Sequence, residues 1–81
     1  MKLKSGKTVT ITPLNTAQKV ECFDCQGDIE RMYKWAMYGL GLRRLSDFDQ
    51  EEHHYSTDEI GEIASATIEE TEKGADPTPK G

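Results

Sequence analysis

The sequence contains few cysteines, few aromatic residues and no long apolar run. Hydrophobic residues make up 35% of its 81 residues, but they never form the run of about 20 that a membrane-spanning helix needs. The first residues lack the apolar core of a signal peptide, so we expect an intracellular, cytoplasmic protein. Motifs of nucleophilic hydrolases, phosphate-binding loops and calcium-binding loops are also missing, and we therefore expect no enzyme and no cofactor.

Basic residues are scarce in the second half of the chain. Residues 1–20 hold four lysines and no acid, residues 21–45 hold four acids and four bases, and residues 46–81 hold eleven acids against Lys73 and Lys80. An acidic C-terminal half repels phosphate backbones, which argues against nucleic acid as a partner. It could instead steer a basic partner, or mimic nucleic acid and occupy the basic groove of another protein.

Residues 1–14 have the pattern of a β-hairpin. Val9 and Ile11 alternate with threonines, a period of two that is typical of a strand with one buried face. Gly6 lies in the predicted turn, and Pro13 ends the ladder because it has no N–H to donate. An isolated hairpin is marginal in water, so we expect this one to pack against helices.

Two capping boxes predict where helices begin. Asn15 and Gln18 open the first helix, which should run to about residue 24 with Val20 and Phe23 inward. Ser56 and Glu59 open the last helix. Each box places a polar side chain at the N-cap and a Glu or Gln three residues later, so that the two can satisfy each other's backbone N–H groups.

The pattern as a whole predicts an α+β fold, with an N-terminal β-hairpin packed on a layer of three helices. Gly74 should end the last helix. We expect one domain over residues 1–74 and a flexible, disordered C-terminal tail over residues 75–81, which contains two prolines and no large apolar side chain.

Residues 29–40 are predicted to form an amphipathic helix with two apolar faces. Six residues share the first face through the spacing i, i+3, i+4, i+7, i+8, i+11: Ile29, Met32, Tyr33, Ala36, Met37 and Leu40. A second stripe on the far side contains Arg31, Trp35, Tyr38 and Leu42. Such a helix is either sandwiched within its own domain or presents one face to a partner. Because Trp, Tyr and Arg are enriched in interfaces, we predict that the second stripe binds a partner.

The segment Cys22-Phe23-Asp24-Cys25 and the pair His53-His54 suggest a different chemistry. A CxxC pair can supply half of a zinc site, and the histidines could complete it. However, adjacent histidines rarely both reach one metal, and Cys22 and Cys25 fall on a predicted helix rather than in the turn of a zinc knuckle. We therefore predict reduced cysteines and no metal site, and keep a zinc-stapled module as an alternative.

The first 15 residues, Met1-Lys2-Leu3-Lys4-Ser5-Gly6-Lys7-Thr8-Val9-Thr10-Ile11-Thr12-Pro13-Leu14-Asn15, are similar to the start of small bacteriophage tail assembly chaperones. Members of that family tend to begin with a hairpin of the type Leu-Lys-Ser-Gly-Lys, followed by a Pro-Leu step into helices. Their compact helices and acidic C-terminus also resemble residues 56–81. The resemblance implies a non-enzymatic role in the host cytoplasm, in which the protein binds apolar segments of tail proteins and keeps them soluble until virion assembly.

The sequence thus predicts a binding or assembly protein. The expected partner is a structural or tail protein, or a second copy of the chain, and neither nucleic acid nor a membrane is expected to bind. Two alternatives remain open at this point: a zinc-stapled module built on the CxxC pair, and an acidic mimic of nucleic acid that inhibits a host protein.

Overall fold

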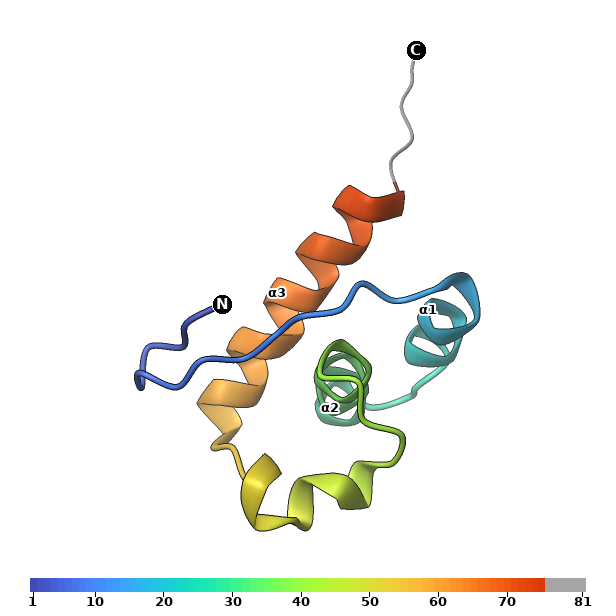
Figure 1. Ribbon diagram of the computed structural model, residues 1–81. Helices are drawn as coiled ribbons and strands as arrows, with labels where there is room; N and C mark the ends of the chain where they lie inside the picture. Colours follow the sequence, from blue (N-terminus) through green and yellow to red (C-terminus); the bar gives the residue numbers. More distant parts are fainter. Residues whose placement is uncertain (76–81) are drawn as a thin grey trace.

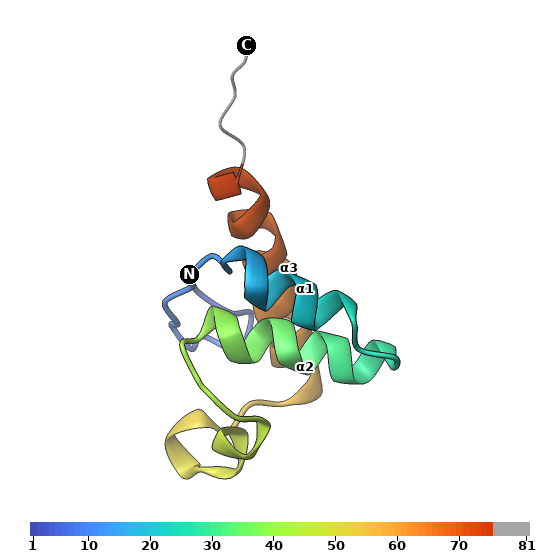
Figure 2. The same ribbon diagram turned by 90° about the vertical axis from the view of Figure 1, so that its right-hand side faces the viewer.

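A computed structural model describes residues 1–75 of the chain and the side chains of residues 1–73. The described elements are α1 (Thr16–Phe23), α2 (Asp28–Gly39), the short 3-10 helices η1 (Leu45–Asp49) and η2 (Glu51–His53), and α3 (Thr57–Ala75). The N-terminal segment, residues 1–14, crosses α3 before it reaches α1 (Figure 1). Helices α1 and α2 run side by side in front of α3 (Figure 2). The predicted tail lies outside the described residues, apart from Ala75, the last residue of α3.

Both predicted capping boxes are confirmed. The side chain of Asn15 accepts the backbone N–H of Gln18 at 2.9 Å, and the Gln18 side chain accepts the N–H of Asn15 at 3.0 Å. Ser56 Oγ accepts the N–H of Glu59 at 3.2 Å, and Glu59 Oε1 accepts the N–H of Ser56 at 2.7 Å. Because each box satisfies two N–H groups that the helix itself leaves without partners, α1 and α3 begin where the sequence predicts.

The end of α2 is fixed by a glycine turn. After Gly39, the last helical residue, Gly41 adopts a φ of +79°. The N–H of Gly41 bonds the carbonyl of Tyr38 at 3.1 Å, and the N–H of Leu42 bonds that of Met37 at 2.9 Å. This pair of bonds is the Schellman motif, which favours glycine at the left-handed position. At the other end of α2 the N-cap is Gly27, and Asp28 is the first helical residue.

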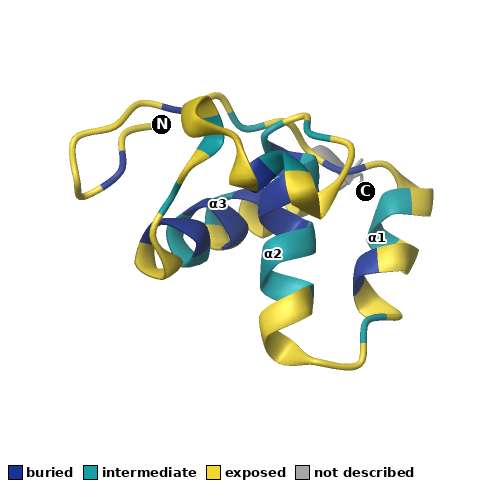
Figure 3. Cartoon of the chain, turned by 90° about the horizontal axis from the view of Figure 1, so that it is seen from below, coloured by how far each residue is buried: buried dark blue, intermediate teal, exposed yellow. Residues whose placement is uncertain are grey.

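Helix α2 is sandwiched within its own domain over its C-terminal half. Trp35, Ala36 and Met37 are at most 3% exposed. On one side they share the core with α3, whose Ile60 and Ile63 are fully buried, and on the other side the Phe23 ring of α1 meets Trp35 edge-on at 5.7 Å. Figure 3 shows the buried residues gathered where α2 meets α3 and exposed residues where α1 turns into α2. No described helix is long and apolar enough to cross a bilayer.

The predicted α+β fold is wrong, because the part of the chain that the structure describes contains no strand. The turn of the expected hairpin does form: Gly6 has a φ of +99°, and the Leu3 N–H bonds the Lys7 carbonyl at 2.8 Å. The ladder then ends after a single antiparallel bridge between Lys2 and Thr8. The fold is therefore helical, with a short N-terminal turn in place of a hairpin.

The helices provide the physical reason for this difference. Antiparallel pairing is limited to the bridge between Lys2 and Thr8 and the bonds that flank it, and the backbone beyond Val9 bonds other parts of the fold. The Thr12 N–H bonds the Gly39 carbonyl at 2.8 Å, and the Leu14 N–H bonds Thr71 Oγ1 at 2.9 Å. The alternating pattern remains visible in the burial of Leu3 and Val9, but these side chains pack on helices rather than on a sheet.

Candidate functional site

Two hollows adjoin each other on α3. The first, here called the apolar groove, has a volume of about 360 Å³ and is lined by Phe23, Asp28, Arg31, Met32, Trp35, Gly61, Ala64, Ser65 and Ile68. The second, here called the acidic hollow, has a volume of about 870 Å³ and is lined by Met1, Ile11, Gly61, Glu62, Ser65, Ala66, Glu69 and Glu70. Gly61 and Ser65 line both, so the two hollows form one continuous surface across α3.

Two helical stripes with the same spacing build the apolar groove. The stripe on α2 consists of Asp28, Arg31, Met32 and Trp35, and the stripe on α3 consists of Gly61, Ala64, Ser65 and Ile68. Residues at i, i+3, i+4 and i+7 share one face of a helix, so the two stripes confront each other. Three of the four residues on α3 are small, and the stripes therefore leave a hollow between them instead of filling it.

Large apolar side chains at the groove face water. Phe23, at the end of α1, is 65% exposed, and Ile68 is 37% exposed. Val20, on the same face of α1 as Phe23, is 62% exposed, and Ile29, next to the groove residue Asp28, is 64% exposed. The prediction that Val20 and Phe23 point inward is wrong because α1 has only eight residues and buries one of them, Cys22. Clustered apolar exposure of this kind marks interaction surfaces.

The four residues predicted to bind a partner do not form an exposed patch. Trp35 is 3% exposed, and Tyr38 and Leu42 are half-buried against the core. The Tyr38 hydroxyl donates to Glu21 Oε2 at 2.6 Å, which ties this side of α2 to α1. Arg31 and Trp35 do line the apolar groove, so half of the predicted stripe lies in this site.

Arg31 holds the end of α1 against the start of α2. Its Nη2 donates to the Cys25 carbonyl at 2.9 Å, and its Nη1 lies 3.5 Å from the Asp28 carboxylate. Its Nε is buried and has no hydrogen-bond partner. The guanidinium therefore forms a polar wall of a groove whose other large side chains are apolar.

Within the CxxC pair, Cys22 does not carry the reactive thiolate that redox or zinc chemistry needs. Cys22 is fully buried, and burial raises the pKa of its thiol to about 11, so it stays protonated at neutral pH. Cys25 is half-buried, and its Sγ donates to the Glu21 carbonyl at 3.6 Å. Both cysteines are free thiols.

The histidines lie apart from this pair: His53 is the last residue of η2, and His54 follows it in the connection to α3. His53 Nε2 lies 3.9 Å from Glu52, and the His54 carbonyl accepts a hydrogen bond from Lys7 Nζ at 3.1 Å. Within the described residues, no three His, Cys, Asp or Glu side chains gather in a way that could hold a metal ion. The structure thus gives the zinc-stapled alternative no support.

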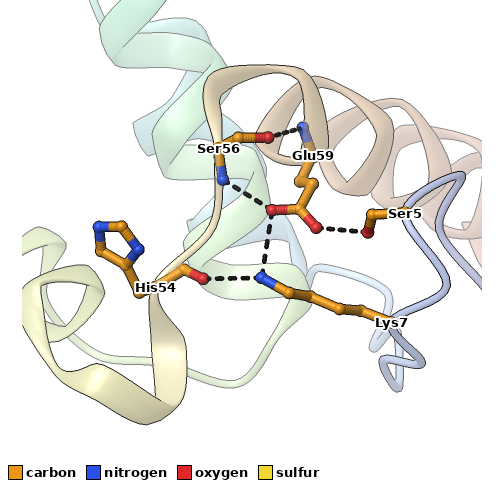
Figure 4. Close-up of polar contacts among 5 residues, drawn as sticks. All are labelled: Ser5, Lys7, His54, Ser56 and Glu59. Carbon is orange, nitrogen blue, oxygen red and sulfur yellow. Dashed lines mark hydrogen bonds and ion pairs between the residues drawn. The ribbon is translucent and has the colours of Figure 1, made fainter.

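Glu59 has a strongly lowered pKa, and its contacts join the N-terminal turn to the start of α3. Figure 4 shows it between the N-terminal turn and the start of α3. It accepts hydrogen bonds from Ser5 Oγ at 2.5 Å, from the Ser56 N–H at 2.7 Å and from Lys7 Nζ at 3.3 Å. These bonds, the Ser5 bond above all, lower the pKa of Glu59 to about 2. A carboxylate of this kind is a poor general base at neutral pH.

Comparisons with protein-family models, curated proteins and solved structures find no significant match to this chain. The resemblance to tail assembly chaperones therefore stays a prediction from the sequence. The candidate site depends on the geometry of the apolar groove alone.

Seven of the nine residues that line the groove, Phe23, Gly61 and Ile68 among them, are not predicted from the sequence as site residues. Phe23 and Ile68 have the apolar character of core residues, and the sequence contains no sign that their surroundings are incomplete. Gly61 does leave a signal, since it interrupts a run of helix-forming residues in which no turn is needed.

Proposed function

We propose that this chain is a non-enzymatic binding protein whose apolar groove holds an apolar segment of a partner protein. The observation that supports the proposal is the exposure of Phe23 and Ile68, at 65% and 37%, where they line the groove. Large apolar side chains that face water at a hollow gain free energy when a partner covers them.

The shape of the groove favours a helical segment as the occupant. It follows one stripe of α2 and one of α3 over about two helical turns, and a bound helix offers anchors at i, i+3 or i+4, and i+7 over the same length. This role agrees with the one implied by the resemblance to tail assembly chaperones, which is to keep apolar segments of other proteins soluble until assembly.

The chemistry of the described side chains gives little support to an enzyme. Cys22 is buried with a raised pKa, and Glu59 already accepts bonds from three donors. The acceptors and donors that remain at the apolar groove are Asp28, Arg31 and Ser65, of which Asp28 and Arg31 pair with each other.

Trp35 provides a direct test, because it is the single tryptophan of the chain and lines the groove. The probe is an amphipathic peptide of about 14 Leu and Gln residues, roughly 21 Å long as a helix. We expect a saturable change in Trp35 fluorescence on titration. Since Phe23 touches Trp35, variants are compared through their dissociation constants, confirmed by calorimetry, and not through signal amplitude.

Two matched substitutions locate the binding site. Phe23→Ser should weaken binding at least about tenfold, because burying a Phe side chain contributes about 1.5–3 kcal/mol. Leu45→Ser is the control, since Leu45 is 38% exposed in η1 and does not line the groove. The proposal fails if the peptide does not bind, or if the two substitutions weaken binding equally.

A further inference from the structure

The acidic hollow extends the proposed binding surface along α3. Three of its lining residues are carboxylates, Glu62, Glu69 and Glu70, whereas Ile11 and Ala66 give it an apolar floor. The apolar groove and the acidic hollow share the small residues Gly61 and Ser65, so the one continues into the other. A segment that lies in the groove and crosses α3 therefore meets carboxylates on the far side.

The carboxylates of the hollow outnumber the cations that face them. Lys73 lies 3.8 Å from Glu69 and 3.4 Å from Glu70, and it is itself 66% exposed. Glu62 accepts the backbone N–H of Lys4 at 3.1 Å, a bond that brings no charge. The Met1 amino group, which also lines the hollow, donates to the Val9 carbonyl at 2.9 Å. Among the described groups that line the hollow or pair with its carboxylates, three are negative and two are positive, so an added cation is attracted to it.

Gly61 lies where the two hollows meet, and the packing of the fold does not require a glycine there. A Cβ at this position would meet only Met32 Sδ, at 3.7 Å, which is ordinary van der Waals contact. The fold therefore has room for alanine, and alanine is the better helix former. Glycine keeps the boundary between the two hollows free of a side chain, because Gly61 lines both of them.

We propose that the occupant is a basic amphipathic helix of a partner protein. Its apolar side chains lie in the apolar groove beside Phe23 and Ile68, its backbone passes over Gly61, and its Lys or Arg side chains lie over Glu62, Glu69 and Glu70. This inference rests on the proposed function, and it adds that the bound segment of the partner is positively charged.

Three peptides of equal length and apolar pattern test the charge. They combine Leu with Lys, Gln or Glu, and their dissociation constants are measured through Trp35 fluorescence and calorimetry at low salt and at about 0.5 M NaCl. An exposed ion pair strengthens binding by about two- to fivefold, so three pairs should make the Leu-Lys peptide about tenfold tighter than the Leu-Gln peptide at low salt. At high salt the difference should shrink to about twofold. The Leu-Glu peptide should bind most weakly.

Substitutions in the hollow assign the effect to these carboxylates. The triple variant Glu62→Gln, Glu69→Gln, Glu70→Gln should lose the preference for the Leu-Lys peptide. The matched control changes the net charge equally but lies in η1 and η2: Asp49→Asn, Glu51→Gln, Glu52→Gln. This control should keep the preference.

Gly61→Ala separates binding from folding. It should raise the melting temperature and yet weaken binding of the Leu-Lys peptide at least about threefold, a combination that a purely structural role does not produce.

The outcomes distinguish the inference from the function on which it rests. If the Leu-Gln peptide binds in a Phe23-dependent way and the Leu-Lys peptide binds no tighter, the inference is overturned and the proposed function stands. If none of the peptides binds, both are overturned. If the protein sediments as a dimer that the Leu-Lys peptide does not dissociate, a second copy covers the surface and the inference is overturned.

Discussion

Replacement of Gly39 by alanine tests the closest helix contact in the fold. Gly39 is buried at the end of α2, and its carbonyl accepts the N–H of Thr12. A Cβ on Gly39 would overlap Thr67 Oγ1 and would lie 2.9 Å from both the Cβ and the Cγ2 of Thr67. Thr67 is fully buried in α3, so it cannot turn away into solvent. The added methyl group must therefore push α2 and α3 apart.

The expected cost follows from three contributions. Overpacking of a core costs about 1–3 kcal/mol, and sometimes more. Loss of the bond from Thr12 as the helices separate adds about 1 kcal/mol, whereas the better helix propensity of alanine returns less than about 1 kcal/mol at the last helical residue. We expect a net loss of about 1–4 kcal/mol in the free energy of unfolding. For a domain of this size each kcal/mol lowers the melting temperature by about 4–8 °C, so the fall should be at least about 4 °C.

Thermal and urea unfolding followed by circular dichroism measures this loss. Gly61→Ala is the matched control, because it adds the same methyl group to α3 in ordinary contact with Met32 Sδ at 3.7 Å, and it should stabilise the protein by up to about 1 kcal/mol. The double variant Gly39→Ala, Thr67→Ala removes two of the three clashing atoms. Its free energy of unfolding should therefore be at least about 1 kcal/mol higher than the sum of the two single losses predicts. If Gly39→Ala melts at the wild-type temperature, the packing of α2 on α3 described above is wrong.

Three further predictions concern buried polar groups. Because the fold lowers the pKa of Glu59 from 4.5 to about 2, the unfolded chain takes up a proton at this group before the folded chain does on acidification. The free energy of unfolding should therefore fall between about pH 5 and pH 2. The urea midpoint of Glu59→Gln should depend less on pH over that range. Cys22 is fully buried, so iodoacetamide should modify Cys25 first, and mass spectrometry should find Cys22 unmodified until the protein unfolds; equal rates for both thiols would contradict its burial. Thr71→Val should cost about 1–3 kcal/mol by urea unfolding, because it leaves the buried N–H of Leu14 without its 2.9 Å acceptor, and a neutral effect would show that water replaces the hydroxyl.

The start points of α1 and α3 could be predicted from the sequence because they depend on residues three positions apart. Asn15 with Gln18, and Ser56 with Glu59, make their bonds whatever the rest of the chain does. The end of α2 is local in the same sense, since Gly41 provides the left-handed turn there. These elements are confirmed because the interactions that define them lie within a few residues of sequence.

The N-terminal hairpin could not be excluded from the sequence, because the competing interactions come from distant residues. Alternation of Val9 and Ile11 with threonines indicates an extended backbone with one buried face, and the structure has neither helix nor strand from residue 9 to residue 14. The acceptors that take its N–H groups, however, are the carbonyl of Gly39 and the hydroxyl of Thr71. Nothing in residues 1–14 shows that helices rather than a second strand would supply them.

The expected binding face of α2 illustrates a related limit. A stripe at helical spacing shows that residues share a face, but it does not show what covers that face. Trp35 is covered by the Phe23 ring and the core, whereas Phe23 itself is left exposed. The apolar surface available to a partner thus lies on α1 and α3 at the edge of Trp35, and not on the face of α2 where the aromatic residues are most concentrated.

The N-terminal segment connects these observations, because it determines which face of α3 stays open. It is bonded to α3 at Glu59, through Ser5, and at Thr71, through Leu14, two points that lie about 18 Å apart along the helix. Between them Met1 and Ile11 form one wall of the acidic hollow. Helix α2 covers another face of α3, so Gly61 and the carboxylates beside it remain at least partly accessible between the two. Residues 1–14, which have the sequence pattern of a hairpin, therefore form one wall of the surface for which we propose a basic helical partner.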